Sequence, residues 1–103
     1  MAALFFDIDG TVVHYHTNKW LPGAYDKLCD LARQGHEIIF VTMRGKQDQD
    51  QEWNVPNTQR LLAQLPFQYQ LIHSLSQPRV LIDDGTPKVF PTRTDSASWV
   101  KAL

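Results

Sequence analysis

Short apolar segments alternate with longer amphipathic stretches along this chain of 103 residues. Continuous apolar runs indicate strands that are buried on both faces, as in parallel sheets. We interpret as strands the segments 3–6, 37–42, 69–72 and 79–82. Their alternation with helical stretches predicts an α/β domain with a mainly parallel sheet.

Two of the intervening stretches place apolar residues at helical spacing. We expect one helix over 22–35 and a second over 56–66, because glycine and proline mark their ends. Asp95 or Ser96 can cap a short last helix. The apolar positions of the three helices are Ala24, Leu28, Leu31 and Ala32, then Leu61, Leu62 and Leu65, then Trp99, Val100 and Leu103.

The composition is that of one globular domain, residues 1–103, with 43% hydrophobic residues available for its core. A net charge of −1 argues against general binding to nucleic acid or to a membrane surface. The single Cys29, which we interpret as a core thiol, excludes an internal disulfide. No leader precedes the first strand and no apolar run is long enough to span a bilayer. These features predict a cytoplasmic protein without a membrane partner.

Two carboxylates follow the first apolar run directly. Asp7 and Asp9 are two positions apart, so along a strand their side chains point the same way. Adjacent carboxylates repel each other unless a hard cation neutralises them or one stays protonated. Gly10 allows a sharp turn, after which Thr11 can direct its hydroxyl and amide back to the same place. The alternative is a pair of exposed carboxylates at a strand end.

Two other predicted strands also end in polar groups. Thr42 and Arg44 follow the second strand, and Asp83-Asp84 follow the fourth. In parallel α/β sheets, ligands bind outside the carboxyl ends of the strands. We therefore expect all three strand ends to meet in one pocket.

Together these segments resemble the motifs of the haloacid dehalogenase (HAD) superfamily of phosphatases. Residues 7–12 are similar to its first motif, Thr42 to its second and Asp83-Asp84 to its fourth, in the same order. The stretch 41–45 further resembles a small branch described as capsule-polysaccharide or sugar-phosphate phosphatases. The resemblance implies a single three-layer, Rossmann-like (HAD-like) domain, and no insertion here is long enough for a cap domain.

The activity implied by this resemblance is Mg²⁺-dependent hydrolysis of a phosphomonoester through an aspartyl-phosphate. Asp7 would be the nucleophile, and Asp9 would protonate the leaving oxygen and then deprotonate water. The implied ligands of Mg²⁺ are Asp7, the main-chain carbonyl of Asp9, Asp83 and Asp84. The expected substrate is a sugar phosphate or another small or exposed phosphate ester.

Four residues near the first two strand ends are expected to bind phosphate or substrate: Thr11, Thr42, Met43 and Arg44. Thr42 and the amides after the first strand would hold the phosphoryl oxygens. Arg44 would bind the same phosphate, or a substrate carboxylate, through two N–H groups. A surface arginine is the alternative interpretation.

A site without a cap is open, which suits a large substrate or a homo-oligomer in which a second subunit covers the site. The segment 13–21 is long enough only for a small flap. Its aromatic and histidine side chains either line the entrance or pack over the first strand. They are His14, Tyr15, His16 and Trp20.

One part of the family pattern is missing. The third motif supplies a lysine that neutralises the nucleophile and the phosphate, and this chain has no lysine between Lys46 and Lys88. We expect Lys88 to be the substitute, with Lys46 second and His73 weaker. Arg79 is excluded on the expectation that it begins the strand that Asp83 ends, roughly 13 Å away. The missing lysine leaves a second hypothesis open, a non-catalytic module that binds phosphate or Mg²⁺.

Overall fold

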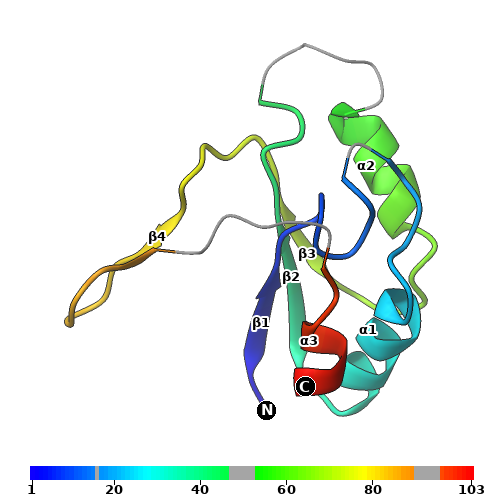
Figure 1. Cartoon of the computed structure of the whole chain (residues 1–103), viewed down its shortest axis with the longest axis horizontal. Coiled ribbons are helices and arrows are strands. Elements are labelled where there is room, and N and C mark those ends of the chain that lie inside the picture. Colours follow the sequence, from blue (N-terminus) through cyan, green and yellow to red (C-terminus); the bar gives the residue numbers. More distant parts are fainter. Residues whose placement is uncertain (16, 47–52, 90–95) are drawn as a thin grey trace.

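The computed structural model describes residues 1–15, 17–46, 53–89 and 96–103 (Figure 1). Three parallel strands in the order β1–β2–β3 form the sheet: β1 (Ala3–Phe6), β2 (Glu37–Val41) and β3 (Gln70–Ile72). In this register Phe6 pairs with Phe40, and Phe40 pairs with Leu71. The predicted α/β class and the parallel pairing of these three strands are confirmed.

Helices connect the strands where the apolar spacing predicted them. α1 (Ala24–Arg33) follows Gly23, and α2 (Val55–Leu62) is capped by Asn54, whose side chain accepts a hydrogen bond from the amide of Asn57. The short α3 (Trp99–Ala102) starts after Ser98 without a side-chain cap. The N-cap residue is thus Ser98 rather than the predicted Ser96, although the Ser96 hydroxyl accepts a 3.4 Å hydrogen bond from the Ser98 amide; Asp95 lies outside the described residues.

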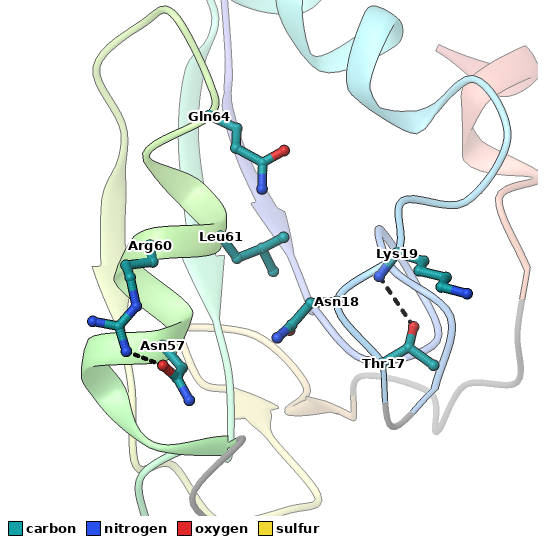
Figure 2. Close-up of a pocket in the computed structure, with 7 residues that line it drawn as sticks. All are labelled: Thr17, Asn18, Lys19, Asn57, Arg60, Leu61 and Gln64. Carbon is teal, nitrogen blue, oxygen red and sulfur yellow. Dashed lines mark hydrogen bonds between the residues drawn. The ribbon is translucent and has the colours of Figure 1, made fainter.

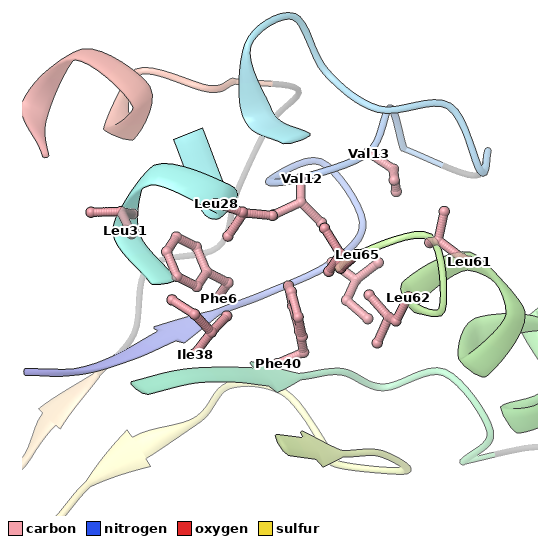
Figure 3. Close-up of a cluster of buried hydrophobic side chains, with 11 residues drawn as sticks. Phe6, Val12, Val13, Leu28, Leu31, Ile38, Phe40, Leu61, Leu62 and Leu65 are labelled. Carbon is pink, nitrogen blue, oxygen red and sulfur yellow. The ribbon is translucent and has the colours of Figure 1, made fainter. Parts of the chain in front are cut away.

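The core lies between the sheet and one layer of helices (Figure 3). Its members come from the strands, from the turn after β1, and from α1, α2 and the turn after α2: Phe6, Ile8, Val12, Val13, Leu28, Leu31, Ile38, Phe40, Leu61, Leu62 and Leu65. Trp99 of α3 packs edge-on against Phe6, with ring centroids 4.8 Å apart. All three helices thus contribute to the core on the same face of the sheet. The opposite helical layer required by a three-layer domain is not present among the described residues.

The fourth predicted strand is placed differently from the expectation. β4 (Val80–Leu81) pairs antiparallel with β5 (Lys88–Val89) in a separate two-stranded sheet. Figure 1 shows this hairpin extending to one side of the parallel sheet. The prediction of a parallel strand over 79–82, next to the other three, is wrong. Residues 83–87, between β4 and β5, have a turn-forming sequence. This sequence favours antiparallel pairing of β4 with β5, which follows it directly in the chain.

Cys29 on α1 is buried and unpaired, as predicted for a core thiol. Burial raises the pKa of this thiol above its ordinary value, which lowers the reactive thiolate fraction at neutral pH. We expect a disulfide-exchange reagent at neutral pH to label the native protein slowly and the urea-unfolded protein at once. Immediate stoichiometric labelling of the native protein would contradict this burial. Within the described ranges, no helix has the length and apolar character needed to cross a bilayer.

Candidate active site at the carboxyl ends of β1 and β2

Asp7 and Asp9 lie in a tight turn that follows β1. The buried Ile8 between them anchors this turn, because its carbonyl accepts hydrogen bonds from the amides of Thr11, Val12 and Val13 at 3.0–3.2 Å. Gly10 adopts the left-handed conformation that the turn requires, with φ of 78°. The side chains of Asp7 and Asp9 remain 21% and 18% exposed. Both carboxylates are therefore within reach of small molecules.

The amides of residues 10–13, after β1, donate hydrogen bonds within the turn itself. The Gly10 amide donates to the carbonyl of Val13 at 2.8 Å, and the Thr11 amide donates to Ile8. The Thr11 carbonyl accepts a 3.0 Å hydrogen bond from the indole Nε1 of Trp99. The expectation that the Thr11 amide holds a phosphoryl oxygen is thus not met in this structure. Instead, Thr11 connects the turn to α3.

Thr42 directly follows β2 and is buried. Its hydroxyl oxygen accepts a 3.1 Å hydrogen bond from the amide of Arg44. The Thr42 carbonyl accepts from the amide of Leu75, which ties the segment after β3 to the same strand end. Met43, between the two site residues, is exposed. The hydroxyl thus shapes the turn that carries Arg44.

Arg44 forms the most extensive set of side-chain contacts at the site. Its Nε donates to Asp9 Oδ2 at 3.0 Å and its Nη2 donates to Asp9 Oδ1 at 2.7 Å. Nη1 donates to Asn18 Oδ1 at 2.9 Å, and Nη2 also donates to the carbonyl of Thr17 at 3.0 Å. The arginine side chain is only 1% exposed. The protein thus engages four of the five N–H donors of this guanidinium. Because the paired Nε–Nη2 donors are among these four and the side chain is buried, the expected contact of Arg44 with phosphate is not available.

Asp9 is consequently held on both of its oxygens. Besides the bidentate pair with Arg44, the indole Nε1 of Trp53 approaches Asp9 Oδ1 at 3.4 Å. Arg44 also donates hydrogen bonds to Thr17 and Asn18, and these connect the flap to the end of β2. The sequence analysis did not predict this network. The available signal was that Asn18 and Trp53, in segments without a predicted helix or strand, each carry a side chain that can form hydrogen bonds.

Arg79 provides the second cation of the site, and its exclusion on sequence grounds is wrong. Its Nη1 lies 3.5 Å from Asp7 Oδ1, which also accepts a 2.8 Å hydrogen bond from the amide of Ile8. The side chain is 13% exposed, and its Nε and Nη2 atoms are buried without a hydrogen-bond partner in the part of the chain that the structure describes. The expected separation assumed a strand parallel to β1. Because β4 belongs to a side hairpin, the residue before it approaches Asp7 instead.

The second carboxylate pair does not join Asp7 and Asp9 in this arrangement. Asp83 and Asp84 are exposed in the β4–β5 turn, where Asp83 Oδ1 accepts from the amide of Gly85 at 2.7 Å. Lys88, the expected cation, is exposed on β5 opposite Leu81. Among the described residues, no group of three or more potential metal ligands is found. The described geometry therefore does not bring together the predicted Mg²⁺ ligands, Asp7, the Asp9 carbonyl, Asp83 and Asp84.

The other predicted substitutes for the lysine also lie at exposed positions. Lys46 follows the turn after β2, and its amide donates to the carbonyl of Met43. His73 follows β3, and its Nδ1 lies 2.8 Å from the hydroxyl of Ser74. The ion pair that the structure shows for Asp7 is with Arg79 instead.

A cavity of about 550 Å³ opens between the flap and α2 (Figure 2). It is lined by Thr17, Asn18, Lys19, Asn57, Arg60, Leu61 and Gln64. Asn18 connects this cavity to Asp9 through Arg44. The lining combines two cationic side chains with amides, which suits a polar or anionic group.

The flap packs partly over the helices. Trp20 is half-buried, and its indole Nε1 donates to Gln64 Oε1 at 3.2 Å. Its ring meets Tyr25 of α1 edge-on at 5.5 Å. Tyr15 is exposed, and His16 lies outside the described residues. Packing therefore accounts for Trp20, while Tyr15 remains accessible near the entrance.

Comparison with known proteins finds no relative. No protein-family model matches the chain, and comparison with curated proteins and with solved structures finds no match. A functional assignment therefore depends on the sequence motifs and on the surroundings of Asp7 and Asp9.

Proposed function

We propose that this chain is a phosphomonoester hydrolase of the HAD type, with Asp7 as the nucleophile. The observation that carries the proposal is an accessible carboxylate, Asp7, at a strand's carboxyl end beside the guanidinium of Arg79. A carboxylate that attacks a phosphate dianion meets like-charge repulsion, so an adjacent cation is a chemical requirement. The motif at residues 7–12 adds the resemblance to a known family of phosphatases.

The reaction follows from this assignment. An Asp7 oxygen bonds to phosphorus while the bond from phosphorus to the leaving oxygen breaks, giving an aspartyl-phosphate. Water then attacks phosphorus and releases inorganic phosphate and the free carboxylate. Asp9 is proposed to protonate the leaving oxygen and to deprotonate that water. Because both Asp9 oxygens accept from Arg44, one of them has to leave the guanidinium during this step.

Mg²⁺ is proposed as the cofactor on the sequence resemblance alone. The carboxylates expected to bind it do not fit in the described arrangement, since Asp7 faces a guanidinium group and Asp83 and Asp84 lie in the hairpin turn. The requirement for Mg²⁺ is tested by comparing turnover in Mg²⁺ and in chelator.

The flap cavity favours a polar leaving group. Lys19 and Arg60 supply positive charge, and Asn18, Asn57 and Gln64 supply amides that can hydrogen-bond to hydroxyls. A sugar phosphate or a similar small phosphate ester has this chemistry. We therefore propose the cavity as the binding site for the part of the substrate that leaves.

The second hypothesis, a non-catalytic module that binds phosphate or Mg²⁺, is favoured by one observation. Both oxygens of Asp9 are occupied by the buried Arg44, so the carboxylate has a structural partner that accounts for its presence. In such a module Asp7 and Arg79 would bind a ligand without transferring a phosphoryl group.

Hydrolysis of an aryl phosphate, with trapping of the phosphorylated protein, distinguishes the two hypotheses. The phosphatase is expected to release the aryl alcohol over many turnovers and to gain one phosphoryl group on Asp7, detected by mass spectrometry after an acid quench. The assay is run with Mg²⁺ and with chelator. Absence of both turnover and phosphorylation in both conditions, with phosphate binding retained, would leave the module as the function.

A further inference from the structure

Two arginines approach the two carboxylates of the site, but their hydrogen bonding differs. In Arg44, the edge formed by Nε and Nη2 donates to both oxygens of Asp9. In Arg79, the same edge is buried and has no hydrogen-bond partner among the described residues, while Nη1 lies 3.5 Å from Asp7. This distance exceeds that of a charge-assisted hydrogen bond, about 2.7–2.9 Å.

A buried charged donor without a partner is unfavourable, because it has lost its hydration without gaining a replacement. Such groups in native proteins require an explanation, and a ligand is one of them. The Nε–Nη2 edge carries two nearly parallel N–H groups, whose spacing matches two oxygens of a carboxylate or a phosphate. Arg44 demonstrates this pairing in the same site, with a carboxylate as the acceptor.

We infer that the Nε–Nη2 edge of Arg79 binds two oxygens of a tetrahedral oxyanion placed against Asp7. The guanidinium then lies between two negative groups, the Asp7 carboxylate on Nη1 and the anion on the other edge. This arrangement reduces the repulsion that the anion meets when it approaches the carboxylate. The inference deepens the proposed function, on which it rests, by assigning phosphate recognition to Arg79 rather than to Arg44 or Lys88.

Binding of inorganic phosphate to the full chain, measured by calorimetry, tests this assignment without turnover. Arg79→Gln is expected to weaken phosphate binding by at least about tenfold, as for loss of hydrogen bonds to a charged group. Arg79→Lys keeps the charge but loses the paired N–H groups. Its phosphate affinity is expected to lie between those of the wild type and Arg79→Gln. Arg33→Gln, on the exposed face of α1, is the matched control and should bind like the wild type.

The Asp7→Asn variant tests whether the phosphate binds next to Asp7. If the phosphate lies against Asp7, removal of this negative charge strengthens phosphate binding, whereas Asp26→Asn on α1 leaves it unchanged. Unchanged phosphate affinity in both Arg79→Gln and Arg79→Lys would overturn the inference, and so would an Asp7→Asn affinity equal to that of the wild type. Thermal melting of each variant identifies any that fails to fold, and the lysine variant then carries the test.

The inference and the proposed function fail separately. Phosphate binding that depends on Arg79, without turnover of an aryl phosphate, refutes the hydrolase and supports the anion site. Turnover whose kcat and KM are unaffected by Arg79→Gln, with phosphate affinity also unaffected, refutes the anion site and supports the hydrolase.

Discussion

Replacing Asp7 with asparagine is expected to lower the turnover of an aryl phosphate by more than about a thousandfold, the scale seen when a catalytic nucleophile is removed. An amide oxygen is a much weaker nucleophile than a carboxylate and does not form a stable acyl phosphate. The variant is also expected to lose the phosphoryl group trapped on the wild-type protein. The measurement is steady-state hydrolysis at saturating substrate, together with the mass of the acid-quenched protein.

Asp26→Asn provides the matched control for this prediction. Asp26 is exposed on α1, and its change to asparagine removes the same charge from the chain. A variant of Asp7 that retains a tenth of the wild-type turnover would remove Asp7 from the chemistry. Loss of activity in both variants would instead indicate a general effect of charge or folding.

The sequence was sufficient for the parts of the fold that depend on local patterns. The apolar runs at 3–6 and 37–41 are strands, and the glycines at 23 and 35 flank the first helix at positive φ. Helical spacing identified the leucines of α1 and α2 that form the core. These features follow from side-chain periodicity and backbone sterics, which act over a few residues.

The position of β4 depended on a competition that the sequence pattern does not resolve. The run Val80–Ile82 is apolar enough for a buried strand, yet these side chains are exposed in the β4–β5 hairpin. A turn at 83–87 allows pairing with Lys88–Val89 at short range, whereas a parallel position requires a long-range contact. Asp83 and Asp84 were expected to meet Asp7 and Asp9 in one pocket, which required the strand before them to take the parallel position.

The partners of the two arginines were also beyond sequence reasoning. A long side chain reaches several positions, so Arg44 was equally compatible with phosphate, substrate or a protein carboxylate. The structure pairs it with Asp9 and pairs Arg79 with Asp7. Each guanidinium is directed by the packing of the flap and of the segment before β4. The sequence of the motif at residues 7–12 does not indicate either contact.

The Asp9–Arg44 pair leads to the second large expected effect. Asp9→Asn removes the charge that compensates a guanidinium with 1% exposure. Breaking a buried ion pair on one side typically lowers the free energy of unfolding by about 3–5 kcal/mol. For a domain of this size we expect a fall in melting temperature of more than about 10 °C. The measurement is urea unfolding, in which the midpoint decreases while the m-value stays constant.

The double variant Asp9→Asn with Arg44→Met serves as the control for this stability effect. Removing both charges leaves no uncompensated guanidinium, so the double variant is expected to be more stable than Asp9→Asn alone. Additive losses in the double-mutant cycle would contradict an energetic coupling between the two side chains. An unfolding midpoint for Asp9→Asn equal to that of the wild type would show that the pair contributes little to stability.

The same Asp9→Asn variant tests the proton transfer, provided that turnover is measured well below its lowered melting temperature. General acid–base groups contribute about 10²–10⁴-fold, and the contribution is largest for a leaving group that needs a proton. We therefore expect the rate of phosphorylation of Asp7, measured as the first burst of alcohol release, to fall far more with an alkyl phosphate than with a nitrophenyl phosphate, whose leaving oxygen departs without a proton. Equal losses of this phosphorylation rate with the two substrates would mean that Asp9 acts through the position of Arg44 and the flap, because a displaced site impairs both reactions alike. A loss confined to the alkyl ester assigns the proton to Asp9, since a structural defect alone does not depend on the leaving group.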